Sequence, residues 1–432
     1  MKNIIKTLSI VLLSALLFGC ESTSQKESAE TLPPEYPPLY EMAQAKGFKM
    51  GGCMNPDNLT SYYYTEMITS DFNSVTATNE MKLYSLLDWN IRSKDGMPAL
   101  RFVNCDKLLQ FCQANNIKVR GHVLVWDAYM TEWFFYEDYR TKKFADAETI
   151  KARMKYCIEA VINHCEEKFP GVVYCWDVVN EAVADGANEA IPGDACRVRK
   201  SRGGAKNMYY ETIGRDYVKW AFKYAHDCIK ENGYDIKLFY NDYNTYMAGK
   251  RNCIIKLVEE VNSKDDVINP TGEKLCDGVG MQCYVGGYGT QSGCMNAGDI
   301  VSIKETIEKF ASLGYEVHIT EMAVRNYDKS EYAQNQQAEF YGKLASMLSH
   351  INETANGKFT CWAIWGMCDN PSLPESDYSY KMNGPYCGMF DWRCRKKPEF
   401  YKTAEALKNE TMKGMINEKG EASASGLPFF LW

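Results

Sequence analysis

From residue 48 onward, apolar runs typical of buried strands alternate with long stretches of helical periodicity, and this alternation limits the possible folds more than any other feature. The eight apolar runs begin at Phe48, Ser74, Lys118, Val173, Lys237, Gly278, Glu316 and Phe359. The clearest helical stretches between them span 101–115, 149–169, 208–231, 300–313 and 331–350. Strict alternation predicts a parallel sheet with helices outside it. Eight such units predict an α/β protein whose single domain is a closed (β/α)8 TIM barrel.

The runner-up fold is an open, doubly wound sheet, which carries a GxGxxG turn after its first strand when it binds a dinucleotide. No such turn follows the run at Phe48, so the barrel is favoured. A hydrophobic fraction of 45% can supply a full core, and the sequence contains no recognisable repeat or second domain. We therefore assign residues 39–412 to the barrel domain and residues 413–432 to a C-terminal tail.

The first twenty residues have the features of a secretory signal peptide. Two lysines precede an apolar stretch that is too short to span a membrane. The stretch ends in Leu17-Phe18-Gly19-Cys20, which resembles a bacterial lipobox. Lipidation of Cys20 would anchor the exported protein at the bacterial cell surface or periplasmic face, and ordinary signal cleavage nearby is the alternative. Residues 21–38 are rich in Ser, Glu and Pro, which predicts a flexible tether.

Composition argues against two classes of function. The net charge of -7 disfavours a nucleic-acid partner, for which a basic face is expected. None of the five histidines has HxH or HExxH spacing, so we expect no catalytic metal.

Sixteen cysteines follow Cys20, an even number that allows disulfides in an exported protein. Cysteine is also a common small buried residue, so no pairing can be deduced. The candidates for bridging lie in the loop-rich C-terminal region: Cys361, Cys368, Cys387 and Cys394. None of them has the CxxC spacing of a zinc site.

The segment WDVVNEA, residues 176–182, is an apolar, β-branched run that leads into Asn180 and Glu181. This pattern is typical of a buried parallel strand that brings a carboxylate to the mouth of a sheet. The run VHITEMAV, residues 317–324, brings Glu321 to a corresponding position. Two glutamates at the ends of two strands indicate hydrolysis of a glycosidic bond, a reaction that uses a pair of carboxyl groups.

The catalytic and substrate-binding residues of a parallel barrel lie at the C-terminal ends of its strands. Further polar and aromatic residues occupy such positions in the other runs: Asn79, Glu80, Lys82, His122, Trp126, Asn241, Asp242, Tyr243, Gln282, Tyr284 and Trp365. We expect them to converge on one cleft. Taken singly, His122 and Trp126 would more often be core residues. Only the other candidate residues at neighbouring strand ends favour a substrate-binding site.

In chain order, the stretches TNEMK, RGHVLVW, WDVVNEA, ETIGRDYVKWAF, LFYNDYN, GVGMQ, HITEM, WAIWGM and GMFDW resemble glycoside hydrolase family 10, the barrel family best known for endo-β-1,4-xylanases. The resemblance runs from about residue 39 to about residue 407. It implies a retaining, endo-acting β-1,4-glycosidase of the xylanase type. The implied substrate is a xylan-like plant cell-wall polysaccharide or its oligosaccharides, and we expect a monomer without a cofactor.

The resemblance implies that Glu181 is the acid/base and Glu321 the nucleophile of a double displacement. Such a pair requires carboxyl groups about 5 to 5.5 Å apart. Because like charges that close oppose each other, we expect a raised pKa for Glu181. The resemblance also implies substrate-binding roles for Asn79, Lys82, His122, Trp126, Asn180, Gln282, Tyr284 and Trp365, and supporting roles for Asp127, Asn241 and Asp242.

Four residues depart from the family's pattern: Thr78 stands in place of a glutamate, Asp127 and Tyr284 in place of histidines, and Leu373 in place of a tryptophan. A tyrosine at 284 can donate a hydrogen bond to Glu321 but cannot become positively charged near neutral pH. A carboxylate at 127 would raise the pKa of the acid/base further. The smaller groups at 78 and 373 predict a looser glycone side that accepts decorated xylan or sugars with a hydroxymethyl arm.

Three other interpretations stay open at this point. The first is a carbohydrate-binding surface protein that kept the barrel and lost turnover, and the second is a β-glycanase that acts on a different backbone. The third is a metal-dependent barrel hydrolase, which the missing histidine clusters disfavour. Activity on a panel of β-linked polysaccharides, abolished by Glu181→Ala or Glu321→Ala, separates a working glycosidase from the first of these.

Overall fold

The computed structural model describes residues 34–92, 95–286, 297–373 and 384–409. The predicted signal peptide with Cys20, most of the predicted tether and the predicted tail lie outside the described residues. The compact unit that holds the barrel begins at Tyr36. Within the described ranges, no helix combines the length and the apolarity that a membrane span requires.

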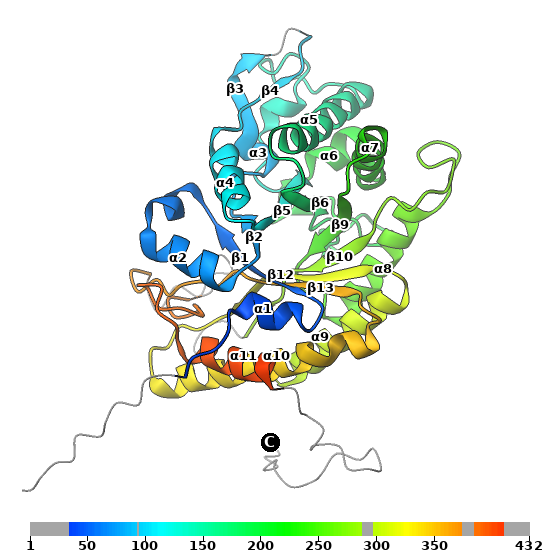
Figure 1. The fold of residues 1–432 in the computed structure, drawn as a ribbon. Helices are drawn as coiled ribbons and strands as arrows, with labels where there is room; N and C mark the ends of the chain where they lie inside the picture. The colour runs from blue at the N-terminus through cyan, green and yellow to red at the C-terminus, as the bar shows by residue number, and fades with distance from the viewer. Residues whose placement is uncertain (1–33, 93–94, 287–296, 374–383, 410–432) are drawn as a thin grey trace, which may run out of the picture. The chain divides into compact units, whose positions relative to one another are not determined.

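In the described residues, eight parallel strands close into a barrel, which confirms the predicted fold (Figure 1). They are β1 (Lys49–Met54), β2 (Ser74–Ala77), β5 (Lys118–Trp126), β6 (Val173–Asn180), β9 (Lys237–Asp242), β10 (Gly278–Met281), β12 (Glu316–Val324) and β13 (Phe359–Ile364). The ring closes because β13 pairs in parallel with β1, with Cys361 opposite Lys49. A short strand, β11 (Tyr284–Val285), continues beside the end of β12.

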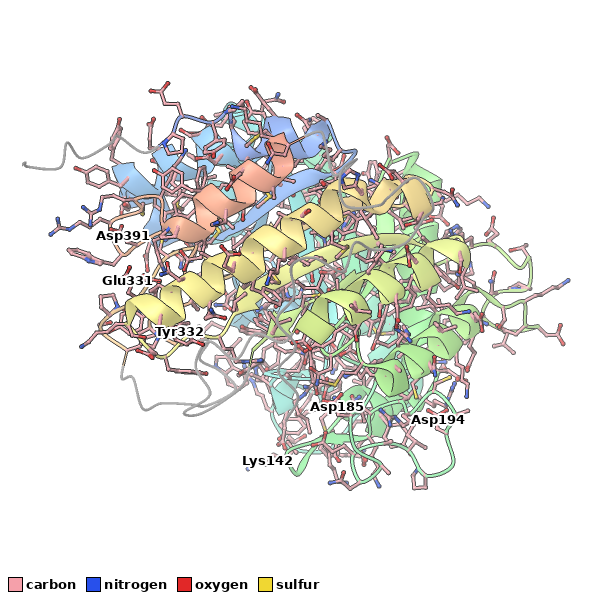
Figure 2. All side chains as sticks on the ribbon, turned by 90° about the horizontal axis from the view of Figure 1, so that it is seen from below. Lys142, Asp185, Asp194, Glu331, Tyr332 and Asp391 are labelled. Atoms are coloured by element: carbon pink, nitrogen blue, oxygen red, sulfur yellow. The ribbon has the colours of Figure 1, made fainter. Side chains whose placement is uncertain are left out.

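A helix follows each barrel strand. In chain order these are α2 (Tyr62–Asp71), α4 (Val103–Ala114), α5 (Ala147–Lys168), α7 (Tyr217–Asn232), α8 (Ala248–Asn262), α9 (Ala297–Ser312), α10 (Glu331–Thr354) and α11 (Pro398–Lys408). The shorter elements are α1 (Leu39–Gln44), α3 (Leu83–Leu86), α6 (Met208–Ile213), the 3-10 turns η1 (Pro56–Thr60) and η2 (Glu132–Phe135), and the hairpins β3 (Leu87–Arg92) with β4 (Pro98–Leu100) and β7 (Ser201–Arg202) with β8 (Ala205–Lys206). Helices α10 and α11 lie side by side, with Glu331 and Tyr332 at the start of α10 (Figure 2).

One local prediction was wrong. The single helix predicted over 208–231 is broken into α6 and α7, because Gly214 adopts a φ of 92°, which a helix cannot continue through. No cysteine pairing could be deduced from the sequence, and every described cysteine is a free thiol. Cys361 is fully buried within β13, while the Sγ atoms of Cys368 and Cys394 lie 3.7 Å apart without a bond.

Inside the barrel, a buried ion pair joins neighbouring strands. The guanidinium of Arg120 on β5 donates to both oxygens of Asp177 on β6, at 2.8 and 2.6 Å, and both side chains are inaccessible to solvent. Nε of Arg120 donates to Nδ1 of His318 on β12 at 3.0 Å. Burial alone would raise the pKa of Asp177, but Arg120 and His122 hold it below its usual value. The pair therefore stays charged and ties three strands together.

Near the start of α11, Glu399 is another buried acid, with no accessible surface. Nζ of Lys397 lies 3.5 Å from its carboxylate. Burial raises the pKa of Glu399 to about 7, more than the charge of Lys397 lowers it. The folded protein therefore holds a proton on Glu399 that the unfolded chain, with a pKa of 4.5, releases at lower pH.

We expect Glu399→Gln to stabilise the protein at pH 8 and to change little at pH 4. The raised pKa of Glu399 contributes to the free energy of unfolding; this contribution is fully present below pH 4.5 and is lost as pH rises through about 7. The gain at pH 8 is on the order of 2 to 3 kcal/mol, read from thermal unfolding at both pH values. Glu405→Gln, an exposed position on the same helix, is the control. Equal effects of Glu399→Gln at both pH values would contradict this assignment.

Candidate active site

Glu181 and Glu321 lie at the C-terminal end of the barrel, joined by a chain of amides. Nε2 of Gln282 donates to Oε1 of Glu181 at 2.9 Å and to Oδ1 of Asn180 at 3.2 Å. Nδ2 of Asn241 donates to the same Asn180 oxygen at 3.0 Å and to Oε1 of Glu321 at 3.0 Å. The two carboxylates are therefore oriented through one shared acceptor, and both residues are largely buried, with 9% and 6% of their surface exposed.

Strand register and one glycine position the amide of Asn241. Asn180 and Asn241 are opposite each other on β6 and β9, and Gly280 on β10 is opposite Asn241. A Cβ atom at Gly280 would lie only 2.3 Å from Oδ1 of Asn241, so a larger residue would displace this amide. Oγ1 of Thr320 donates to that oxygen at 2.8 Å. The amide nitrogen of Asn241 is therefore turned toward Asn180 and Glu321.

Glu181 directly follows β6 and has a φ of 56°. This left-handed conformation costs a residue with a side chain on the order of 1 to 2 kcal/mol. Two hydrogen bonds to the Glu181 backbone hold this conformation. Its N–H donates to the Asn241 carbonyl at 2.8 Å, and its carbonyl accepts from the Arg199 side chain, Nε, at 3.1 Å. The strain is therefore retained by contacts from the next strand and from the following loop.

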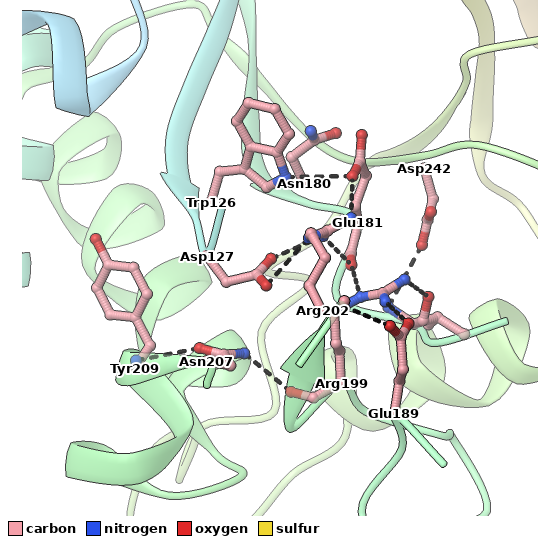
Figure 3. A network of polar contacts seen from close by, with 12 residues as sticks. Trp126, Asp127, Asn180, Glu181, Glu189, Arg199, Arg202, Asn207, Tyr209 and Asp242 are labelled. Atoms are coloured by element: carbon pink, nitrogen blue, oxygen red, sulfur yellow. Dashed lines mark hydrogen bonds and ion pairs between the residues drawn. The ribbon is translucent and has the colours of Figure 1, made fainter. Parts of the chain in front are cut away.

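Arg202, on the hairpin strand β7, lies between Glu181 and Asp127 (Figure 3). Its Nη1 donates to Oε2 of Glu181 at 2.8 Å, and its Nη2 donates to Oδ1 of Asp127 at 2.8 Å. Nε1 of Trp126 also donates to Oε2 of Glu181, at 3.3 Å. Asp127 therefore faces the Arg202 guanidinium, which stands between it and the glutamate.

The raised pKa expected for Glu181 was wrong, and Asp127, whose charge was expected to raise this pKa further, pairs with Arg202. Burial does raise the pKa of Glu181, but the positive charge of Arg202, the hydrogen bond from Gln282 and the charge of Lys250 together hold it below its usual value. No sequence signal indicated this, because Arg202 is 21 residues from Glu181 along the chain, on the short hairpin strand β7.

On the other side of the pair, the Tyr284 hydroxyl donates to Oε2 of Glu321 at 2.6 Å. Burial and the charge of Glu321 raise the pKa of Tyr284 well above its usual value. The tyrosine therefore keeps its proton and stays a donor. Together with Asn241, it gives each oxygen of the Glu321 carboxylate one hydrogen bond.

Asn79 and Lys82 lie beside Trp126. Nζ of Lys82 donates to Oδ1 of Asn79 at 3.2 Å and stands 5.2 Å from the Trp126 ring centroid. Two tyrosines that the sequence reasoning missed extend this group: the Tyr84 hydroxyl donates to Asn79 at 2.8 Å, and the Tyr129 ring lies 5.6 Å from Tyr84 and 5.3 Å from Trp126. Their only sequence signal is their place two residues after TNEMK and three residues after RGHVLVW.

Two further predicted residues, His122 and Asp242, are buried. His122 is almost fully buried, and its Nδ1 is 2.8 Å from Asp177 in the barrel interior. Asp242 is buried between the Tyr240 hydroxyl and Nζ of Lys250, at 2.5 and 2.9 Å. Burial raises the pKa of Asp242 more than Lys250 lowers it. Asp242 thus holds Lys250 close to Glu181.

Three predicted positions are partly exposed. Trp365 directly follows β13 and packs against the core. The Thr78 hydroxyl lies 3.5 Å from Oε2 of Glu80, which also accepts from the Asn79 N–H at 3.0 Å. The Leu373 N–H donates to the Asn370 carbonyl at 3.0 Å in a turn.

Within the described residues, one group has a spacing suited to a metal ion: His226, Asp227 and Glu273. Lys223 and Lys230 form ion pairs with its two carboxylates. These ammonium groups already neutralise the carboxylates, so the group is better explained as a surface ion-pair network.

A sequence model described as glycosyl hydrolase family 10 matches residues 38–406. A putative endo-1,4-β-xylanase of Caldicellulosiruptor saccharolyticus is 37% identical over 338 residues, which cover 76% of this chain and 96% of the relative. Endo-1,4-β-xylanase B of Butyrivibrio fibrisolvens is 31% identical over 83% of this chain, and the match spans 52% of that relative's length. Among solved structures, the CBM22-1 and GH10 modules of Clostridium thermocellum endo-1,4-β-D-xylanase 10B, complexed with xylohexaose, align with a TM-score of 0.71 at 26% identity, covering 86% of this chain and 67% of that one.

Proposed function

The chain belongs to glycosyl hydrolase family 10, and from this premise we propose that it is an endo-1,4-β-xylanase that cleaves xylan with retention of configuration. The observation that carries the proposal is the pair of buried glutamates whose carboxylates are linked through the Asn180 oxygen. A retaining glycosidase needs such a pair, one member as nucleophile and the other as acid and then base.

In the first step, a carboxylate oxygen of Glu321 attacks the anomeric carbon while Glu181 gives its proton to the departing glycosidic oxygen. In the second step, Glu181 takes a proton from water, the water oxygen attacks the same carbon, and the bond to Glu321 breaks. Asn241 and Tyr284 orient the nucleophile. Because the Asn180 oxygen already accepts two bonds, its amide nitrogen is the group available to donate to a sugar hydroxyl.

We further propose that the substrate is a decorated xylan. Thr78 and Leu373 provide less bulk and fewer charged acceptors than a glutamate and a tryptophan would, which supports a looser glycone side. The exposed ring of Tyr129 adds an apolar face of the kind that packs against sugars.

Export and lipid anchoring through Cys20 are also a proposal, supported by the basic start, the short apolar stretch and the sequence Leu17-Phe18-Gly19-Cys20. Metabolic labelling of the full chain with a radioactive fatty acid tests it. Label in the parent and none in Cys20→Ser is the expected result, and equal labelling of both would contradict it.

We expect the full chain to release short products from arabinoxylan or glucuronoxylan with a higher kcat/KM than from plain xylan, and to act poorly on mixed-linkage glucan. Proton NMR during the first minutes should show β-configured reducing ends. Glu181→Ala and Glu321→Ala should each lower kcat/KM on xylan by about 10³-fold or more. Glu353→Ala, an exposed position with its side chain 73% accessible, is the matched control.

Three results would separate the alternatives. Binding of xylan without turnover by the parent would favour a carbohydrate-binding protein. A clear preference for undecorated xylan would remove the proposal of a looser glycone side, and a preference for mixed-linkage glucan would indicate a different backbone.

A further inference from the structure

We propose that Arg202 is a positioning residue for the acid/base: it fixes the carboxylate of Glu181 and, with Asp127 as its counter-charge, sets the pH range in which Glu181 carries a proton. The inference rests on the proposed glycosidase function, because it concerns the group that protonates the leaving oxygen. Arg202 was not among the residues expected from the motifs.

The guanidinium of Arg202 uses all three of its nitrogens in the site (Figure 3). Nε and Nη2 form a fork on the two oxygens of Asp127, at 3.3 and 2.8 Å, and Nη1 is left facing Oε2 of Glu181 at 2.8 Å. The Asp127 side chain is only 3% exposed and that of Glu181 12%. A planar, two-point pairing with Asp127 fixes the direction in which Nη1 donates, which a lysine could not do.

The backbone that carries Arg202 is itself anchored to Glu181. The N–H of Gly203 donates to Oε1 of Glu189 at 2.7 Å, and the other oxygen of Glu189 pairs with Arg199. Nε of Arg199 in turn donates to the Glu181 carbonyl at 3.1 Å. The hairpin and the glutamate are therefore parts of one bonded network, so the position of Arg202 is determined by the fold.

Several other charged groups surround Glu181. They are the cations Lys82, Arg199 and Lys250 and the anions Asp127, Asp242 and Glu321, from the segments after β2, β5 and β6 and from β9, β12 and α8. Two tyrosines, Tyr243 and Tyr284, face the same charge and keep their protons, because burial raises the pKa of each. Among the described residues, Arg202 is the cation whose ion pair with the Glu181 carboxylate has hydrogen-bond geometry.

The first chemical step needs Glu181 protonated and the second needs it ionised. Burial favours the protonated form, whereas Arg202 stabilises the carboxylate and contributes most to keeping the pKa of Glu181 low. Arg202 therefore favours the base step and confines the acid step to lower pH. Removing its charge should move the loss of kcat/KM on the alkaline side toward higher pH.

The test compares pH profiles of kcat/KM on xylan for the full-length parent and three variants. In Arg202→Gln, the alkaline limb should move up by about one pH unit. In Arg202→Lys, which keeps the charge and loses the fork, the limb should stay near that of the parent while kcat falls. Arg215→Gln is the matched control, because Arg215 lies in the same crossover, has the same 28% side-chain exposure and pairs with Asp194 and Glu260.

A carboxyl ¹³C NMR titration of Glu181, assigned with Glu181→Gln, makes the test independent of turnover. An upward shift of the Glu181 titration in Arg202→Gln supports the inference even if the parent cleaves no xylan, an outcome that would defeat only the proposed function. Unchanged titrations and alkaline limbs in Arg202→Gln, or equal shifts in Arg202→Gln and Arg215→Gln, would overturn the role assigned to Arg202.

Discussion

The amide oxygen of Asn180 accepts one hydrogen bond from Asn241 and one from Gln282, and this shared acceptor orients both glutamates. Each donor belongs to a different strand or strand end, so the arrangement exists only when β6, β9, β10 and β12 are in their observed register. Closure of the barrel supplies that register. Glycine at 280 then leaves the space that the Asn241 amide occupies.

Two arginine–aspartate pairs have different consequences: Arg120 on β5 pairs with Asp177 on β6, and Arg202 on the hairpin strand β7 pairs with Asp127, which follows β5. Arg120 and Asp177 are fully enclosed, and removing one partner would leave an uncompensated charge, which typically costs about 3 to 5 kcal/mol. Arg202 and Asp127 stand at the rim, where the arginine remains partly accessible and still has a nitrogen for Glu181. The enclosed pair maintains the scaffold, and the rim pair sets the electrostatic surroundings of the reacting group.

Much of the fold was predictable because every barrel strand is buried on both faces, so that each reads as a continuous apolar run. The rule that barrel chemistry stands at strand ends led to Asn180, Glu181 and Glu321. Arg202 lies on the two-residue strand β7 and Tyr129 lies in a turn, both without a periodic pattern, so only the folded chain shows which side chains they meet. The low pKa of Glu181 could not be predicted for the same reason, since it depends on a guanidinium brought close by tertiary structure.

The most direct test of the central claim is covalent trapping of the nucleophile. A 2-deoxy-2-fluoro-β-xylobioside with a good leaving group should inactivate the full chain, because the fluorine slows both steps while the good leaving group speeds only the first, so that the ester accumulates. Mass spectrometry of the digested protein should then place one xylobiosyl ester on the peptide that contains Glu321. Label on any other residue, or complete turnover of xylan by an enzyme that never forms the ester, would contradict the account.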